Sequence, residues 1–411
     1  MSDPTLRQAA ILVGGLGSRL GALTAATPKP MLTVGDRPFL AWLLRELCRF
    51  GVEEALLLSG HHGQAVEDAL PALQALLPKP MRLVCVREPA PLGTGGALVH
   101  ALPWLDARFL LCNGDSWLDA NLARLLADAA ADPPGTARMW LRRLEDASRS
   151  GVAELTGDVV TAFRERPPAP GPGLINAGIS VLDRALIAGL PAGPLSLERD
   201  GLPRWAEAGL LRGTVGEGWF IDIGVPADFA RAQTEIPARL HRPALFLDRD
   251  GVINRDHGWV GSRERFDFMP GAKEAVAAAH AAGWHVFVVT NQSGIARGLY
   301  TEAQFDALMR WVAGEMRAAG GTLDDLRHCP HHPDFGPPCG CRKPAPGMLR
   351  DLLARWALDP RRCLVVGDKA SDLAAGAALG MAGHLFAGGT LDGFLRPLLQ
   401  PPLLPAEGGP S

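Results

Sequence analysis

Short apolar runs recur along the chain, each followed by a stretch of helical periodicity, and this alternation limits the fold more than any other feature. In the first half of the chain, runs of four to six residues occur at 9–13, 54–59, 82–86, 109–112, 137–142 and 178–182. An amphipathic helix is expected at 38–50. Continuous apolar runs of this length are typical of parallel strands that are buried on both faces. The pattern therefore predicts an α/β fold with a mostly parallel sheet covered by helices.

A second series of strands starts at residue 244. Its runs, at 244–248, 285–290 and 363–366, alternate with long alanine-rich helical stretches. The segment TEIPARLHRP separates the two series, and the end of the chain is rich in proline and glycine. Each series is long enough for a domain of its own. We therefore predict two Rossmann-like domains, at residues 1–235 and 244–396, joined by a linker at 236–243. A disordered tail is expected at 397–411.

Composition and charge exclude several classes of protein. With 47% hydrophobic and 21% charged residues, the 411-residue chain is neither disordered nor fibrous. A net charge of −3 provides no basic surface for nucleic acid, and no apolar run is long enough to cross a membrane. The N-terminus has no signal-peptide pattern. Because three of the seven cysteines lie between 329 and 341, we expect a cytoplasmic protein with a metal site rather than disulfides.

A glycine-rich turn follows the first strand directly. Turns of this kind let backbone N–H groups point inward and bind an anion, and Arg19 adds a positive charge. Lys29 is one of only five lysines in the chain and lies between two prolines, where a compact ammonium group serves a phosphate better than a guanidinium does. The alternative for the glycines alone is a tight turn without a ligand. The predicted phosphate-binding turn consists of Gly14, Gly15, Gly17 and Ser18.

Together with RPFL at 37–40, the motifs GGLGSRL and TPKPM resemble the opening of the sugar-1-phosphate nucleotidyltransferase family. The resemblance continues through the first domain and implies the nucleotidyltransferase fold for it. It also implies the positions of further ligand-binding residues, including a Glu–Lys pair whose lysine is an arginine here. These residues are Glu88, Gly93, Thr94 and Gly95 for the base and the sugar, Asn176 for the sugar, and Glu165 with Arg166 for the pair.

The same resemblance implies the reaction. An oxygen of a sugar 1-phosphate attacks the α-phosphorus of a nucleoside triphosphate, and pyrophosphate leaves. Both partners are anionic, so Mg²⁺ held by Asp115 and Asp222 would neutralise and align them. Arg19 would stabilise the departing pyrophosphate, and Lys29 would hold phosphate oxygens near the reacting centre.

The second domain opens with two carboxylates, Asp248 and Asp250, at the end of its first strand. Such a pair can supply a nucleophile and a general acid/base. The segments VVTNQSG at 288–294, RKP at 342–344 and VGDKASD at 366–372 follow in an order that resembles the haloacid-dehalogenase superfamily. The resemblance implies a phosphatase in which Asp248 is the nucleophile and Asp250 the acid/base. Its other residues would be Thr290, Asn291 and Lys343 around the phosphoryl group, and Asp368, with Asp248 and the Asp250 carbonyl, around Mg²⁺.

Within that superfamily, DRDGVIN, TNQSGIARG and CRKPAPGML resemble the D-glycero-D-manno-heptose 1,7-bisphosphate phosphatases. The histidinol-phosphate phosphatases share the aspartates and are the close alternative. Because the stretch from Asp250 to Thr290 is too short for a large cap domain, we expect a capless fold with an open site. Arg342 is a candidate for distinguishing the two ends of the substrate.

A cysteine-rich loop precedes the predicted lysine. Cys329, His331, Cys339 and Cys341 supply four soft ligands, which suit a closed tetrahedral Zn²⁺ site of the structural type. Three reduced cysteines without a metal are the alternative.

The two resemblances together predict a bifunctional enzyme whose partners are small sugar phosphates and a nucleoside triphosphate. A nucleotidyltransferase needs a 1-phosphate, so the phosphatase must remove the phosphate at C7. The implied pathway uses GTP and leads to GDP-heptose for a surface polysaccharide, such as lipopolysaccharide, or for a glycoprotein. Two alternatives remain open: a mannose- or glucose-type transferase fused to a histidinol-type phosphatase, and a sugar-nucleotide sensor attached to a live phosphatase.

Overall fold

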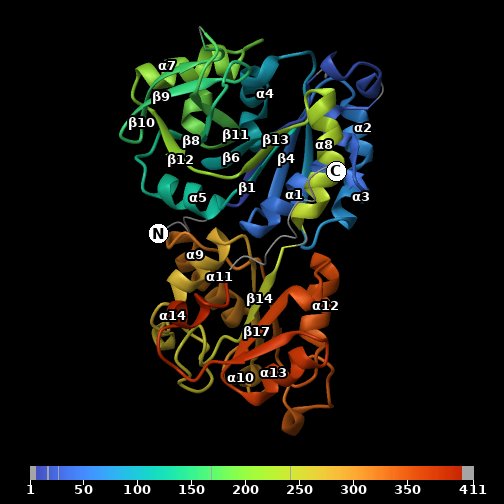
Figure 1. The fold of residues 1–411 in the computed structure, drawn as a ribbon, viewed down its shortest axis with the longest axis vertical. Helices are drawn as coiled ribbons and strands as arrows, with labels where there is room; N and C mark the ends of the chain where they lie inside the picture. The colour runs from blue at the N-terminus through green and yellow to red at the C-terminus, as the bar shows by residue number, and fades with distance from the viewer. Residues whose placement is uncertain (1–5, 16–17, 26, 168, 241, 400–411) are drawn as a thin grey trace, which may run out of the picture. The chain divides into compact units, whose positions relative to one another are not determined.

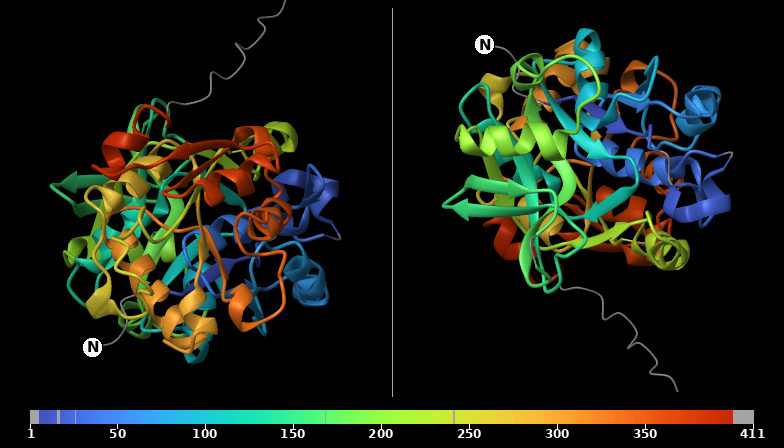
Figure 2. Two further views of the ribbon diagram at one scale, coloured as in Figure 1. Left: turned by 90° about the horizontal axis from the view of Figure 1, so that it is seen from below. Right: turned by 90° about the horizontal axis from the view of Figure 1, so that it is seen from above.

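The computed structural model describes residues 6–15, 18–25, 27–167, 169–240 and 242–399. The chain divides into two units, Met1–Leu240 and His241–Ser411. Figure 1 shows the first unit in blue to yellow-green and the second in yellow to red. Both units are α/β, which confirms the predicted fold class. Figure 2 shows the same ribbon from two further directions, in the colours of Figure 1.

The sheet of the N-terminal unit has nine strands, in the order β5-β4-β1-β6-β11-β8-β12-β10-β9. The six predicted runs correspond to β1, β4, β5, β6, β8 and β11, whereas the strands after β8 were largely missed. The strands of this unit are β1 (Gln8–Leu12), β2 (Thr33–Val34), β3 (Arg37–Pro38), β4 (Glu54–Ser59), β5 (Arg82–Arg87), β6 (Arg108–Asn113), β7 (Ser116–Asp119), β8 (Ala137–Leu144), β9 (Val152–Thr156), β10 (Val159–Arg164), β11 (Gly173–Asp183), β12 (Leu211–Val215) and β13 (Trp219–Asp222).

The prediction of a mostly parallel sheet holds for only part of this unit. Strands β5, β4, β1 and β6 are parallel, but β11 runs antiparallel to both β6 and β8. A two-residue turn, Gly157-Asp158, joins β9 to β10, and such a short connection can only join antiparallel strands. Apolar runs predict burial but carry no information about strand direction, so the pattern did not reveal this part of the sheet.

Helices cover this sheet, and α1 occupies the position that its periodicity predicts. The core between sheet and helices includes Leu98, Phe109, Met139, Leu182 and Trp205, all at most 4% exposed. The helices are α1 (Phe39–Arg49), α2 (Gly63–Asp68), α3 (Leu70–Ala75), α4 (Gly93–Ala101), α5 (Leu122–Ala130), α6 (Arg184–Ala188), α7 (Leu202–Glu207) and α8 (Pro226–Leu240).

Helix α8 extends further than the sequence suggests. Residues 236–240 of the predicted linker are helical, although Pro237 removes one backbone N–H from the helix. Ile236 is fully buried, and the ring of Pro237 packs against Gly35. The burial of Ile236 and the packing of Pro237 outweigh the helix-breaking tendency of proline, so the predicted linker is wrong for residues 236–240. Residue 241 lies outside the described part.

The C-terminal unit contains a five-stranded sheet in the order β16-β15-β14-β17-β18, which is parallel as predicted. The three apolar runs correspond to β14, β15 and β17, whereas β16 and β18 were missed. The strands are β14 (Ala244–Leu247), β15 (His285–Asn291), β16 (Asp325–Cys329), β17 (Cys363–Gly367) and β18 (Ala382–Leu385). The helices are α9 (Ala272–Ala281), α10 (Ser293–Ala296), α11 (Glu302–Ala318), α12 (Gly347–Trp356), α13 (Ala370–Ala377) and α14 (Leu391–Leu395).

Alternate residues of the central strand pack on opposite faces of this sheet. Leu245 and Leu247 join the core that α9 and α11 cover. Phe246 stacks on Phe287, with ring centroids 5.0 Å apart, and Phe287 contacts Trp356 of α12. Figure 1 shows these helices on opposite sides of β14 and β17. Because both faces are covered, the carboxyl edge of the sheet is the place where polar groups can gather.

Between Asp250 and the start of β15 at His285, the described residues form only a 3-10 turn, α9 and connecting loops, in agreement with a capless fold. At the other end of the unit, Leu399 is 6% exposed and belongs to the core. The predicted disordered tail is therefore wrong for residues 397–399, because Leu399 is buried with Leu395; residues 400–411 lie outside the described part. No described helix has the length and apolarity that a bilayer crossing requires.

Gly35 provides a test of the contact that anchors α8. Its φ of +64° is left-handed, and a Cβ there would lie 2.6 Å from Cγ of Pro237. We expect Gly35→Ala to lower the free energy of unfolding by about 3 kcal/mol, since left-handed strain and a steric clash add. Gly157→Ala is the matched control, with a φ of +65° and no neighbour within 4 Å. Gly157→Ala should lower the free energy of unfolding, measured in urea, by only about 1 kcal/mol. Equal losses in the two variants would contradict the role of the α8 contact.

Candidate functional site

The glycine turn after β1 packs closely against a neighbouring loop. A Cβ on Gly14 would lie 2.7 Å from the backbone nitrogen of Gly60, so only glycine fits there, whereas Gly15 has open space around it. Gly17 lies outside the described residues. Ser18 begins a 3-10 turn, Ser18–Thr24, and only its backbone is described.

Lys29, Asp115 and Asp222 come together at the ends of different elements. Lys29 lies in a 3-10 turn, and its Nζ is 2.7 Å from Oδ2 of Asp115. Strands β7 and β13 pair antiparallel and place Ser116 opposite Asp222. The N–H of Ile223 donates to the carbonyl of Asp115 at 2.9 Å, which joins the two aspartate segments. Two carboxylates 107 positions apart in the chain thus share one end of a two-stranded ribbon.

The two carboxylates at this centre repel each other. Burial raises the pKa of Asp222, and the nearby Asp115 carboxylate raises it further, while Lys29 and Arg19 act in the opposite direction. One oxygen of Asp222 already accepts from the N–H of Gly224 at 2.7 Å. Carboxylate oxygens on a partly buried centre are the donor set that Mg²⁺ prefers, and a divalent cation would relieve the repulsion between them.

The predicted base-reading loop is held by its own side chains. Glu88 accepts from the N–H of Leu92 at 2.7 Å, and burial raises the pKa of this carboxyl. Thr94 donates to Glu198 at 2.6 Å and accepts from the N–H of Leu197 at 2.8 Å. The Thr94 hydroxyl therefore shapes the loop through these two protein contacts, and its predicted contact with a ligand stays a prediction.

Gly93 and Gly95 pack against residue Leu195, so the loop lies close to that segment. Asn176 accepts from the N–H of Gly178 at 3.0 Å, and Gly178 packs against Asn113, next to the Asp115 motif.

Glu165 and Arg166 follow β10 and are exposed. They make no hydrogen bond or ion pair with any described residue, so the structure does not link this predicted pair to the Lys29–Asp115–Asp222 centre.

In the C-terminal unit, a buried lysine lies between two buried carboxylates. Asp248 follows β14 directly, and its Oδ1 is 2.9 Å from Nζ of Lys343. The same Nζ is 2.7 Å from Asp372 and donates to the carbonyl of Val289 at 2.8 Å. Burial raises the pKa of Asp248 to about 6, although Lys343 opposes this shift.

Asp248, Asp368 and Asp372 each offer a carboxylate oxygen, and these oxygens lie within 4.8 Å of one another. Oδ1 of Asp368 is buried without a hydrogen-bond partner in the described part of the chain. A buried oxygen without a donor is costly unless a cation satisfies it, so the three residues fit Mg²⁺. Sequence reasoning placed Asp372 in the VGDKASD motif but did not predict it as a metal ligand. The signal that could have found it is its position as the second aspartate of that motif, four residues after Asp368. The carboxylate of Asp250, whose carbonyl was the predicted ligand, lies outside this set.

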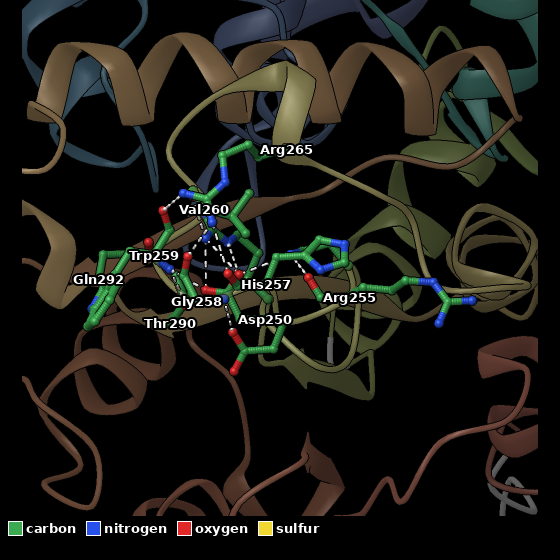
Figure 3. A network of polar contacts seen from close by, with 12 residues as sticks. Asp250, Arg255, His257, Gly258, Trp259, Val260, Arg265, Thr290 and Gln292 are labelled. Atoms are coloured by element: carbon green, nitrogen blue, oxygen red, sulfur yellow. Dashed lines mark hydrogen bonds and ion pairs between the residues drawn. The ribbon is translucent and has the colours of Figure 1, made fainter.

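Asp250 is held by donors on several sides (Figure 3). Its carboxylate accepts from Nη2 of Arg249 at 2.7 and 2.8 Å, and from Nδ2 of Asn254 at 3.0 Å. Nε2 of Gln292 donates to Oδ2 of Asp250 at 2.9 Å and to the hydroxyl of Thr290 at 2.8 Å. Gln292 therefore connects the predicted acid/base Asp250 with Thr290, which was predicted to bind the phosphoryl group. Sequence reasoning missed Gln292 because a buried amide has no spacing signal of its own.

Asn291 positions the buried lysine. Its Oδ1 accepts from the N–H of Lys343, and its Nδ2 donates to the Lys343 carbonyl, both at 3.1 Å. Both polar atoms of the predicted substrate contact are thus used to hold the backbone of Lys343. The neighbouring Arg342 donates to the carbonyl of His331 at 3.0 Å, which joins it to the cysteine-rich loop.

Arg249 and Arg265 fasten a loop at 255–260, and Figure 3 labels Arg265 beside this loop. Arg249 donates to the carbonyl of Val260 at 2.7 Å. Arg265 donates to the carbonyls of His257 and Gly258, both at 2.9 Å. Backbone carbonyls hold this loop, so its sequence alone did not mark it as part of the site.

Cys329, His331, Cys339 and Cys341 form a compact cluster. The sulfur of Cys341 lies 3.2 Å from that of Cys329 and 3.3 Å from that of Cys339, and 3.4 Å from Nδ1 of His331. Four donors around one ion at Zn–S distances of about 2.3 Å would be about 3.7 Å apart. The observed separations are close to this value, so the cluster fits a tetrahedral metal.

Each unit of the chain is similar to known proteins. Residues 8–239 match the Nucleotidyl transferase family, and residues 340–394 match the HAD-hydrolase-like family. A D-glycero-beta-D-manno-heptose-1,7-bisphosphate 7-phosphatase of Rhodopseudomonas palustris is 46% identical over 163 residues, which are 38% of this chain and 91% of that relative.

Two solved structures are also similar. HddC from Yersinia pseudotuberculosis is 29% identical with a TM-score of 0.49, over 56% of this chain and 98% of its own. The D,D-heptose 1.7-bisphosphate phosphatase from B. bronchiseptica, complexed with magnesium and phosphate, is 38% identical with a TM-score of 0.34. The match covers 40% of this chain and 89% of that phosphatase.

The chain therefore belongs to the nucleotidyl transferase family, and its C-terminal part to the family of D-glycero-beta-D-manno-heptose-1,7-bisphosphate 7-phosphatases. It joins a nucleotidyltransferase and a haloacid-dehalogenase-type phosphatase in one enzyme. Both resemblances inferred from the sequence motifs are confirmed.

The buried lysine provides a test of the phosphatase centre. Replacing Lys343 by methionine leaves the carboxylates of Asp248 and Asp372 buried without their cation. In metal-free protein, we expect this variant to lower the free energy of unfolding of the C-terminal unit by about 3 kcal/mol. We also expect it to release no phosphate.

Lys369→Met is the matched control for this loss. Lys369 also contacts two aspartates, Asp256 at 3.2 Å and Asp368 at 3.5 Å, but its side chain is 56% exposed. Replacing Lys369 should lower the free energy of unfolding by less than about 1 kcal/mol. A similar loss of stability in both variants, measured by urea unfolding, would show that burial of the ion pair is not decisive.

Proposed function

We propose that this enzyme carries out two consecutive steps of heptose activation. The C-terminal domain removes the C7 phosphate of D-glycero-D-manno-heptose 1,7-bisphosphate, and the N-terminal domain transfers a nucleotidyl group, from GTP, to the resulting heptose 1-phosphate. The observation that carries this proposal is the 46% identity to a 7-phosphatase, over 91% of that relative, in a chain that also contains a nucleotidyl transferase domain. A 7-phosphatase leaves the anomeric phosphate in place, and a sugar-1-phosphate nucleotidyltransferase needs that phosphate.

In the phosphatase, a carboxylate oxygen of Asp248 would attack phosphorus, and the bond from phosphorus to the C7 oxygen would break. Asp250 would give its proton to the departing C7 oxygen and then take one from the water that hydrolyses the aspartyl phosphate, which releases inorganic phosphate. Because Asp250 is held by Arg249 in this structure, its side chain must turn away from Arg249 to reach the leaving oxygen. Thr290 and Lys343 would hold the phosphoryl oxygens.

Mg²⁺ held by Asp248, Asp368 and Asp372 would offset the negative charge of the phosphoryl group. Lys343 already neutralises part of the charge of Asp248 and Asp372, and it keeps the nucleophile oriented at the sheet edge. The nucleophile therefore enters the reaction with its position set by the protein.

In the transferase, an oxygen of the heptose 1-phosphate would attack the α-phosphorus of the nucleotide, and the bond to the pyrophosphate would break. Lys29 would hold phosphate oxygens at this centre, and Arg19 would take up the charge of the leaving pyrophosphate. Mg²⁺ held by Asp115 and Asp222 would align the two anionic reactants. The sugar nucleotide formed would serve surface polysaccharide synthesis, and we infer a cytoplasmic location for the enzyme.

The direct test of the proposal is product analysis. The protein is incubated with heptose 1,7-bisphosphate, Mg²⁺ and one nucleoside triphosphate at a time, and the sugar nucleotide is identified by mass spectrometry. We expect GDP-heptose without a C7 phosphate. Rapid formation of a sugar nucleotide that still carries this phosphate would reverse the proposed order of the steps.

The two sites should act independently, because each has its complete set of carboxylates within one unit. We expect Asp248→Asn to abolish phosphate release, with nucleotidyl transfer to supplied heptose 1-phosphate within about twofold of the wild type. Asp115→Asn, the reciprocal variant, should lose pyrophosphate release and keep phosphate release. A large loss of both activities in either variant would refute independent sites.

We propose that the cysteine cluster binds one structural Zn²⁺, which keeps Arg342 and Lys343 in place from the adjacent Cys341. Purified protein should contain one zinc per chain by elemental analysis. Cys341→Ser should lose most of it together with most of the phosphatase activity, and should keep the transferase activity. Cys85→Ser, a cysteine of the other unit, is the control and should retain the metal; zinc-free protein with full phosphatase activity would disprove the site.

A further inference from the structure

The chain contains a single tyrosine, Tyr300, which lies outside every motif described above. It is 7% exposed and follows α10 in the C-terminal unit. A Cβ on either Gly261 or Gly294 would overlap its ring, so the ring is packed between these two glycines. This packing keeps the hydroxyl at one place.

That hydroxyl determines the orientation of the Gln292 amide. It donates to Oε1 of Gln292 at 2.6 Å, and Gln292 is itself 1% exposed. The two ends of an amide group have nearly the same shape, so its hydrogen-bond partners decide which way it faces. With Oε1 bound to Tyr300, the NH₂ group faces Thr290 and Asp250 (Figure 3), and both of its protons are used.

The orientation has a consequence for Thr290. A threonine hydroxyl has one proton to donate, and here its oxygen accepts from Gln292. Its own proton therefore remains available for a phosphoryl oxygen at the end of β15. If the amide were reversed, Oε1 would face Thr290 and take that proton, and it would also face the carboxylate of Asp250, where two oxygens repel.

We propose that Tyr300 is a positioning residue of the phosphatase site. It acts through Gln292, keeping Thr290 as a donor to the phosphoryl group and supporting the carboxylate of Asp250. The inference rests on the proposed phosphatase function of this domain. Burial raises the pKa of Tyr300 to about 12, so the hydroxyl stays a donor throughout the range in which the enzyme would work.

The first test compares Tyr300→Phe with the wild type. Phenylalanine keeps the ring between the two glycines and removes only the hydroxyl, so the melting temperature should change little. We expect kcat for phosphate release to fall about tenfold, the loss of one oriented hydrogen bond. Gln304→Met is the matched control: it replaces another amide near Tyr300, one that caps α11 and does not contact Gln292, and should leave kcat within about twofold.

A double-mutant cycle separates positioning from packing. In the Gln292→Met background, where the amide is absent, Tyr300→Phe should lower kcat by less than a further twofold. If the hydroxyl acted only through general stability, its loss would lower kcat about tenfold in both backgrounds, and that result would overturn the inference.

A second readout does not depend on activity. Because the chain has one tyrosine, protein labelled with ¹³Cζ-tyrosine gives a single resonance, which reports the hydrogen bond of this hydroxyl. We expect the resonance to shift in Gln292→Met and to stay in place in Gln304→Met. An unchanged resonance in Gln292→Met would overturn the inference.

The assay distinguishes this inference from the proposed function. Phosphate release is measured with heptose 1,7-bisphosphate and with p-nitrophenyl phosphate. A wild-type enzyme that hydrolyses only the second compound would refute the heptose substrate, while a tenfold lower rate of Tyr300→Phe on that compound would still support the positioning role. Equal rates of Tyr300→Phe and the wild type on both substrates would refute the role of Tyr300.

Discussion

The ammonium group of Lys343, buried between Asp248 and Asp372, is the interaction on which the phosphatase site depends. Two carboxylates at the same sheet edge would repel each other without it, and a buried charge needs a partner at close range. Much of the neighbouring structure keeps this group in place. Asn291 binds both the N–H and the carbonyl of Lys343, and the carbonyl of Val289 accepts from its ammonium group. Cys341, two residues before the lysine, belongs to the cysteine cluster.

The transferase site meets the same requirement with a different construction. Lys29 is more accessible, and it pairs with one aspartate while Arg19 acts from the glycine turn. Parallel strand ends assemble the phosphatase centre, whereas a small antiparallel ribbon assembles this one. In both sites the lysine balances only part of the charge of the carboxylates. A divalent cation can balance the rest and can then also bind an anionic substrate.

Sequence reasoning succeeded where burial and chemistry coincide in a short segment. Strands such as β14 and β15 are apolar because both faces are covered. Asp248, directly after β14, and Thr290, near the end of β15, mark the site. Strand β16 was missed because Arg327 and His328 interrupt any apolar run, and the direction of β11 is not encoded by hydropathy at all. Gln292 and Tyr300 could not be assigned from the sequence, since their contacts depend on how α10 and its neighbouring loop pack.

The pairing of β7 with β13 has a consequence for the order in which the protein is made. Asp115 leaves the ribosome long before Asp222, so the first metal centre cannot close until the strand 219–222 has been translated. Once that strand has emerged, every residue of this centre is outside the ribosome, although most of the second domain has yet to be made. The N-terminal domain can thus reach its final fold while the rest of the chain is still being synthesised, which keeps two α/β domains of similar architecture from exchanging strands during biogenesis.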